Sequence, residues 1–318
     1  MAQPVTDLDR TPPVSVITTV HNERGAVDAL IRSLLAQTHP PDEIVCADAG
    51  STDGTGRALD RWAARDGRIR ILSVAGNRSM GRNAAIAAAT HDFIAGIDSG
   101  CVAEPRWLEH LVAARARGAS WVAGFYRPQG TTARATCAGY ALVPTPEDVD
   151  PATFLPSGRS VAFERRLWRE VGGFPEHLDF AEDTWFGQRL RDAGHEPAFV
   201  PEAVVRWTPP AGYAALARSA WHYGRGDGQG RLRGWTYRRL FGLHASLALA
   251  VLAGTRHRRT TAAVAAAPYL AALWRQTRHT FAHVPAVAWP HVPATEALAL
   301  ASATAGYLRG RADPGSSG

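Results

Sequence analysis

The stretch Ile44-Val45-Cys46-Ala47-Asp48-Ala49-Gly50-Ser51-Thr52-Asp53-Gly54-Thr55 decides the fold. Its first four residues are apolar and suit a buried strand, and a small polar turn follows them. The residue types at 51–53 commonly cap a helix start, while Gly50 and Gly54 permit tight backbone geometry. Asp48 is therefore expected at the carboxyl end of a parallel strand, where open α/β sheets bind ligands.

The same alternation of strand and helix extends to both sides of this stretch. Short apolar runs rich in β-branched residues predict further buried strands at 14–20, 69–74 and 93–97. Apolar residues at helical spacing predict the intervening helices, the first of them over 27–35. This order predicts an α/β fold, with a mostly parallel sheet and helices on both of its faces.

The second half of the chain is less regular. A strand is predicted at 120–126, and a loop-rich segment containing three prolines follows at 131–155. Regular secondary structure is expected again at 158–163, where another strand-like run occurs. A helix is predicted over 213–223, leading into the glycine-rich run 224–230. No internal repeat is visible.

Charge is distributed unevenly along the 318 residues. All 35 basic residues are Arg; residues 1–205 carry 21 Arg against 26 acidic residues, and residues 206–318 carry 14 against 3. The strongly basic last third suggests an anionic partner such as lipid headgroups or phosphates. Three scattered cysteines form neither a disulfide framework nor a metal-binding spacing, which favours a reducing, cytoplasmic setting.

The C-terminal part contains two apolar runs, 241–254 and 260–274, with a basic segment between them. Each run is shorter than the ~20 residues that a membrane-spanning helix needs. Helices lying in the membrane interface, or a packed helical subdomain, are therefore expected here. The predicted organisation is a polar tail at 1–12, a main domain at 13–230 and a basic helical tail at 231–318.

The motifs of the main domain resemble those of the family-2 glycosyltransferases. Val16 to Glu23 resembles that family's first strand and loop, with His21 in place of its Tyr. Asp48 matches the first aspartate of its Asp-Asp-Gly-Ser-Thr-Asp run, and Ala49 replaces the second. Three further motifs follow in the family's order: Arg82-Asn83, Asp98-Ser99-Gly100 at the Asp-x-Asp position, and Glu182-Asp183.

This resemblance implies a nucleotide-diphospho-sugar transferase fold of type A, with a nucleotide-binding part at about 13–125 and a catalytic, acceptor-binding part at about 126–230. It implies an inverting transfer of one sugar to a hydroxyl acceptor, with Asp183 as general base and Glu182 beside it to orient the base or the acceptor. The residues implied in nucleotide-sugar binding are Thr19, His21, Glu23, Asp48, Arg82 and Asp98. An acidic pair at a helix start is also favoured by the helix dipole, which is the structural alternative for Asp183.

Metal binding departs from the family's pattern. The second aspartate of Asp-x-Asp is replaced by Gly100, so Asp98 alone remains to bind a magnesium or manganese ion. Where relatives place a histidine near the metal, this chain has Arg206. Arg206, with Arg225, is expected to supply part of the positive charge that a metal would give to the diphosphate. A loosely bound ion, held by Asp98 and the donor's phosphates, is the alternative.

Two other functions remain open at this point. A nucleotide-sugar-binding protein without catalysis would explain the altered Asp-x-Asp site, although Asp183 argues against it. A nucleotidyltransferase would want a Gly-rich loop bearing Lys or Arg after the first strand, and residues 20–23 lack one. The expected partners are a nucleoside diphosphate sugar, a hydroxyl acceptor (saccharide, lipid-linked or small molecule) and an anionic membrane surface. Nucleic acid is not expected, and the expected location is cytoplasmic, peripheral at the inner face of the membrane.

Overall fold

The computed structural model describes residues 12–255 and 259–313, which divide into two compact units. Unit 1 comprises the chain up to Arg127 together with Pro146–Trp207, and unit 2 comprises Pro128–Thr145 and the chain from Thr208 onward. The predicted tail at 1–12 falls almost entirely outside the described residues, and so does most of the basic segment 256–259. The divisions predicted near residue 125 and at residue 230 separate parts of the chain by their expected function, and they stay predictions.

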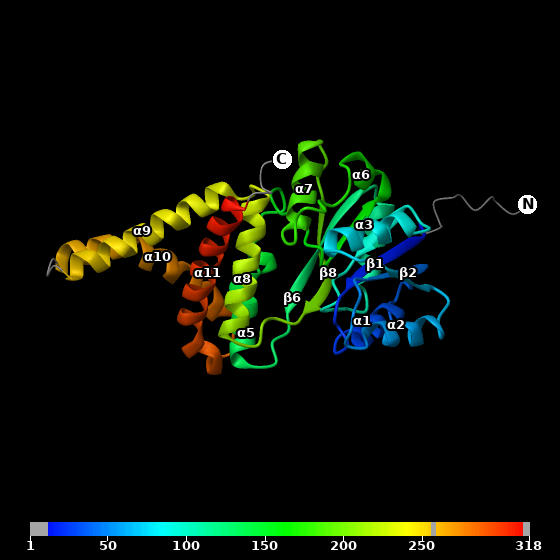
Figure 1. Cartoon of the computed structure of the whole chain (residues 1–318), viewed down its shortest axis with the longest axis horizontal. Coiled ribbons are helices and arrows are strands. Elements are labelled where there is room, and N and C mark those ends of the chain that lie inside the picture. Colours follow the sequence, from blue (N-terminus) through cyan, green and yellow to red (C-terminus); the bar gives the residue numbers. More distant parts are fainter. Residues whose placement is uncertain (1–11, 256–258, 314–318) are drawn as a thin grey trace, which may run out of the picture. The chain divides into compact units, whose positions relative to one another are not determined.

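Unit 1 is built on one eight-stranded sheet (Figure 1). In spatial order its strands are β3 (Ile69–Ser73), β2 (Glu43–Asp48), β1 (Val14–Val20), β4 (Phe93–Gly96), β7 (Val161–Glu164), β6 (Trp121–Pro128), β8 (Ala198–Trp207) and β5 (Cys101–Ala103).

The direction of the strands changes within the sheet. β3, β2, β1 and β4 pair in parallel, as the strand–helix alternation of the first hundred residues predicts. β7 pairs antiparallel with both β4 and β6, and β5 pairs antiparallel with β8. The predicted α/β class is confirmed, and the sheet is mixed because β7 runs antiparallel to both of its neighbours and β5 runs antiparallel to β8.

Helices cover both faces of the parallel half, with α1 and α2 on one side and α3 on the other (Figure 1). The helices of unit 1 are α1 (Val27–Leu35), α2 (Thr55–Ala63), α3 (Arg78–Ala88), α4 (Trp107–Ala116), α6 (Arg165–Glu170) and α7 (Glu182–Asp192). α3 lies so close to β1 that a Cβ on Gly81 would come within 2.9 Å of Thr19 Cγ2. This contact fixes the start of α3 beside the carboxyl end of the sheet.

Unit 2 is helical. It contains α5 (Ala133–Leu142), α8 (Tyr213–Gln229), α9 (Gly234–Thr255), α10 (Arg259–His283) and α11 (Val292–Ala312), with a 3-10 turn at Ala286–His291. The prediction of a loop-rich segment at 131–155 is wrong over α5. The Thr132 side chain accepts from the Ala135 amide at the start of this helix, and Cys137 and Ala138 are buried in hydrophobic clusters of unit 2, so tertiary packing overrides the local sequence.

The glycine-rich run after residue 223 is also helical, because α8 continues to Gln229. α8 packs against α11 at very short range through glycines of both helices: a Cβ on Gly224 of α8 would come 2.0 Å from the Ala303 carbonyl oxygen, and one on Gly306 of α11 would come 2.1 Å from that of Trp221. These glycines serve a close helix contact, which outweighs their poor helix propensity.

α9 and α10 are longer than the apolar runs that predicted them, with 22 and 25 residues. Even so, within residues 12–255 and 259–313 no helix combines the length and the apolar character that crossing a membrane requires.

Glu296 makes the stability of unit 2 depend on pH. Its side chain is buried in α11, accepts a hydrogen bond from Thr280 and lies near Cys137 and Gln276. Burial raises the pKa of Glu296 to about 7, so the folded state holds a proton that the unfolded state releases near pH 4.5. The resulting stability is complete below pH 4.5 and is lost as the pH rises to about 7.

We therefore expect Glu296→Gln, which is neutral at every pH, to be more stable than the parent at pH 8, by about 3 kcal/mol. Urea unfolding at pH 5 and pH 8, followed by a probe in unit 2, measures this. Equal pH dependence in the two proteins would show that Glu296 is ionised in the folded state.

Candidate functional site

The loops after β1, β2 and β4 meet at the carboxyl edge of the sheet in unit 1. Asn22 Oδ1 accepts from the Thr52 amide at 2.8 Å, and the Glu23 amide donates to Thr55 Oγ1 at 2.8 Å. The Glu23 carboxylate in turn interacts with Ser99, in the loop after β4. These contacts place three polar loops where ligands of parallel sheets bind.

Asp48 organises the turn that follows β2. Its Oδ1 accepts from the Ser51 amide at 3.0 Å and from Ser51 Oγ at 2.6 Å. A Cβ on Gly56 would lie 3.1 Å from the other oxygen, so only glycine leaves that side of the carboxylate open. Asp48 thus shapes the turn with one oxygen and presents the second at the start of α2.

His21 belongs to the same edge: its Nδ1 lies 3.2 Å from the Ala49 carbonyl oxygen, and the side chain is exposed.

Glu23 also lies at this edge. Burial raises the pKa of its carboxyl, and hydrogen bonding to Ser99 together with the charge of Arg78 oppose this rise. The structure therefore gathers Thr19, His21, Glu23 and Asp48 at one edge, as their spacing after the predicted strands requires.

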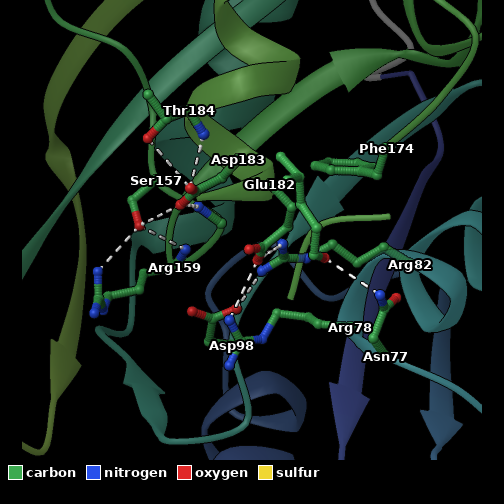
Figure 2. Close-up of polar contacts among 12 residues, drawn as sticks. Asn77, Arg78, Arg82, Asp98, Ser157, Arg159, Phe174, Glu182, Asp183 and Thr184 are labelled. Atoms are coloured by element: carbon green, nitrogen blue, oxygen red, sulfur yellow. Dashed lines mark hydrogen bonds and ion pairs between the residues drawn. The ribbon is translucent and has the colours of Figure 1, made fainter. Parts of the chain in front are cut away.

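Arg82 lies at the centre of a charge cluster, which we call the Arg82 cluster and which consists of Arg78, Arg82, Asp98 and Glu182 (Figure 2). The side chains of Arg82 and Glu182 are buried, that of Asp98 is partly buried and that of Arg78 is exposed. Arg82 Nη1 donates to Glu182 Oε1 at 2.5 Å, and Nη2 donates to Asp98 Oδ1 at 2.6 Å. Arg78 reaches the same Glu182 oxygen at 3.3 Å. One guanidinium thus joins two of the motifs that the sequence singles out, one at the end of β4 and the other at the start of α7.

Charge balance decides the protonation of Asp98. Burial by itself would raise the pKa of this carboxyl, but the guanidinium groups of Arg82, Arg78 and Arg159 outweigh burial and hold the pKa below its ordinary value. Asp98 is therefore ionised at neutral pH.

Asn83, the neighbour of Arg82, has a positioning role. Its Oδ1 accepts from the Phe174 amide and from Trp168 Nε1, both at 2.9 Å, and its Nδ2 donates to the Phe174 carbonyl oxygen at 2.9 Å. The side chain thereby holds the turn at residues 172–175, Gly-Gly-Phe-Pro, in place, and the centre of the Phe174 ring lies 5.3 Å from the Arg82 guanidinium.

Asp183 occupies the first turn of α7 and points away from the Arg82 cluster (Figure 2). Ala181, just before the helix, has φ of 61°, a left-handed conformation that is uncommon outside glycine and is often retained at functional sites. Asp183 Oδ2 accepts from the Gly158 amide at 3.0 Å and from Ser157 Oγ at 3.2 Å, while Oδ1 accepts from the Thr184 amide at 2.7 Å. Glu182 and Asp183 are thus neighbours in sequence with separate partners.

The loop 157–159 connects the two carboxylates. A Cβ on Gly158 would come 2.2 Å from Arg82 Nη2, so this loop rests directly on the Arg82 cluster. Arg159 donates to Ser157 Oγ at 3.2 Å, and its guanidinium lies 4.5 Å from the centre of the Trp207 ring and 5.1 Å from that of Tyr126. Sequence analysis missed Ser157, Gly158, Arg159 and Arg78, because they belong to no motif and only the folded chain brings them together.

The two arginines predicted to face the diphosphate have other contacts. Arg206 is half exposed on β8 and pairs with Glu104 at 3.4 Å. Arg225 lies in unit 2, where it donates to Asp313 at 2.9 Å. Their role toward a donor stays a prediction.

The described residues provide few ligands for a metal ion. Among residues 12–255 and 259–313, no group of three or more His, Cys, Asp or Glu side chains is placed to hold a metal ion. One carboxylate oxygen of Asp98 accepts from Arg82, so its second oxygen is the one that would bind an ion. Gly100, at the position of the motif's second aspartate, has no side chain to add a ligand. Magnesium is often bound by one carboxylate and substrate phosphates, so these residues fit an ion only together with a bound donor.

Comparison with known proteins agrees with this geometry. The sequence model described as "Glycosyl transferase family 2" matches residues 15–138. The glycosyltransferase AglE of Haloferax volcanii is 26% identical over 230 residues, covering 68% of this chain and 73% of that protein. The succinoglycan biosynthesis protein ExoA of Rhizobium meliloti is 29% identical over 246 residues, covering 72% of each.

A solved structure shows the same fold over almost the whole chain. The mannosyltransferase PcManGT from Pyrobaculum calidifontis, in complex with GDP-Man and Mn²⁺, superposes with a TM-score of 0.60 at 21% identity and covers 95% of this chain and 88% of its own. The predicted transferase type of fold is therefore confirmed. Residues 15–138 match family 2 of the glycosyltransferases, and sequence and fold together identify the chain as a glycosyltransferase.

Proposed function

We propose that this enzyme moves a single sugar from a nucleoside diphosphate sugar to a hydroxyl acceptor with inversion, and that Asp183 is the general base. The observation that carries the proposal is the separation of the acidic pair at α7. Glu182 is neutralised by Arg82, whereas none of the described residues that donate a hydrogen bond to Asp183 is an arginine.

The chemistry follows from this arrangement. An ionised carboxylate has about four lone-pair positions. The Ser157 hydroxyl and the Gly158 and Thr184 amides occupy three of them, while the Thr184 hydroxyl lies at 3.5 Å, the limit of a hydrogen bond. The remaining one accepts the proton of the acceptor hydroxyl as its oxygen attacks the anomeric carbon. The bond from that carbon to the diphosphate oxygen breaks as the new bond forms, so a single displacement inverts the configuration.

Donor binding is proposed at the carboxyl edge of the sheet. Asp48 accepts from N–H groups of the base, with Thr19, His21 and Glu23 lining the nucleoside side. Asp98 faces the ribose or diphosphate, with Arg82 fixing its orientation. PcManGT, which has the same fold, is in complex with GDP-Man, and this supports a nucleotide sugar as the donor.

The departing diphosphate requires positive charge, and we propose that Arg159 supplies the largest share. Its guanidinium is near enough to Asp98 to lower the pKa of that carboxyl, and two aromatic rings hold it in place. Arg206 is proposed to contribute less. A magnesium or manganese ion on Asp98 and the donor's phosphates would supply Lewis-acid stabilisation of the same charge.

The positive charge that stabilises the departing diphosphate can come from arginine or from a metal ion, and the two sources predict different rates of transfer in the variants. We expect Arg159→Ala to lower kcat about a hundredfold, as loss of one aligned donor to a developing anion does, and Arg206→Ala to lower it only a few-fold. Excess chelator should leave the parent within about tenfold of its full rate. Activity abolished by chelator and restored by magnesium or manganese, with Arg159→Ala equal to the parent, would assign the charge to a metal.

The acceptor is proposed to be a saccharide, lipid-linked or small-molecule hydroxyl, and the proposed location is cytoplasmic, peripheral at the inner face of a membrane. The proposed function is tested by screening the full chain against nucleoside diphosphate sugars. At least one should raise the melting temperature by mass action and be hydrolysed or transferred. A nucleotide sugar that binds without either reaction would point to a binding protein.

A further inference from the structure

We propose that α9 and α10 form a docking surface for an anionic lipid membrane and lie in its interface. Figure 1 shows the two helices side by side in unit 2. This inference goes beyond sugar transfer, because it concerns where the protein is held. Its test requires no transfer activity.

Exposed large apolar side chains gather on these helices. Among the described residues, every exposed large hydrophobic except Met80 lies in unit 2, and most of these are on α9 and α10. Leu249 and Leu252 are 56% and 58% exposed and lie three residues apart on α9, and Leu270 and Trp274 are 56% and 63% exposed and lie four apart on α10. Side chains at these spacings share a helix face, so each helix presents an apolar stripe to solvent.

The charge of this region has a single sign. Residues 228–295 contain nine Arg and no Asp or Glu. The described arginines within the two helices are exposed: Arg238 and Arg239 on α9, and Arg259, Arg275 and Arg278 on α10. Basic residues beside exposed leucine and tryptophan are the composition of helices that lie in an anionic interface, where arginine meets the headgroups and the apolar side chains enter the acyl boundary.

Charge also indicates whether the partner of this surface is an anionic lipid membrane or a second copy of the chain. Two such surfaces placed face to face would bring arginine against arginine with no carboxylate on either helix, which repels. An anionic bilayer supplies both the opposite charge and an apolar phase. Tryptophan at an exposed position, such as Trp274, is the residue type enriched at membrane–water interfaces.

The experiment is flotation of the full chain with vesicles of phosphatidylcholine, alone or mixed with phosphatidylglycerol. We expect binding to the mixed vesicles only, weakened by salt. Arg275→Gln/Arg278→Gln should bind about thirtyfold less, because each arginine near an anionic surface contributes about fivefold. Leu249→Ser/Leu252→Ser should bind about tenfold less, because two apolar side chains no longer enter the bilayer.

Two controls separate insertion from general charge attraction. Arg61→Gln/Arg117→Gln changes the net charge equally on exposed residues of unit 1 and should bind like the parent. All three native cysteines are buried, so an environment-sensitive dye can be attached at Leu252→Cys, with Arg117→Cys as the matched site. Only the dye at position 252 should shift to shorter emission wavelengths with the mixed vesicles.

Other outcomes overturn the proposal. Equal flotation with neutral vesicles, or none with either kind, excludes an anionic lipid partner. Equal loss of binding in the unit 1 control shows non-specific charge attraction. A lipid-free dimer that Leu249→Ser/Leu252→Ser dissociates, in sedimentation equilibrium, identifies a second copy as the occupant.

Discussion

Asp183→Asn is expected to bind the nucleotide sugar like the parent and to transfer sugar at least a hundredfold more slowly. The amide is nearly isosteric with the carboxylate but does not take up a proton, and a positioned general base contributes roughly 10²–10⁴ in rate. Single-turnover transfer with saturating donor isolates this step, and donor affinity is measured separately by calorimetry.

The Asp183→Asn test needs a structural control, since this carboxylate also accepts from the Ser157 and Gly158 loop. Asp192→Asn changes another aspartate of α7, where Gln188 donates to it at the exposed end of the helix, and should behave like the parent. An unchanged melting temperature in both variants excludes loss of fold as the cause. Transfer by Asp183→Asn within a few-fold of the parent would assign the base to another residue.

The nucleotide-binding half of the sheet was predictable because its signals are local. The apolar runs at 14–20, 44–47 and 93–97 end in polar turns, and α1 has a clear apolar face, so β1, β2, β4 and α1 follow directly from periodicity. α5 was missed because it is stabilised by burial of Cys137 and Ala138 in unit 2, which no local pattern reports. The end of α8 was missed because glycine usually marks a turn, and here it permits close contact with α11.

The residues of the candidate site also fall into two groups, those that the sequence predicts and those that it does not. Asp48, Asp98 and the pair at 182–183 stand in ordered motifs, so sequence alone singled them out. Arg159 carries no such signal, since its place depends on β7 pairing antiparallel to β6 and on the rings of Tyr126 and Trp207. The sequence singles out the carboxylates and Arg82, but it does not report the contacts between them or the places of Arg78 and Arg159.

Arg82→Met is the second large effect that we expect, and it concerns stability. The substitution leaves Glu182 and Asp98 without the guanidinium that joins them at 2.5 and 2.6 Å. Removing one partner of a buried ion pair costs about 3–5 kcal/mol, because the remaining charge is buried and uncompensated. The pKa of Asp98, now held low by Arg82, should rise in the variant, so its stability should recover as the pH falls.

Arg78→Met is the matched control, because Arg78 contacts the same Glu182 oxygen from a side chain that is 42% exposed; we expect it to cost at most about 1 kcal/mol. The Glu182→Gln background completes a double-mutant cycle for Arg82. There the loss caused by Arg82→Met should shrink by about 1–3 kcal/mol, because the carboxylate that needs the guanidinium is absent. Urea unfolding of the four proteins, followed by a probe in unit 1, measures the coupling. If the two substitutions add to within about 0.5 kcal/mol, Arg82 and Glu182 do not stabilise the fold as a pair, and the link between the end of β4 and the start of α7 has another origin.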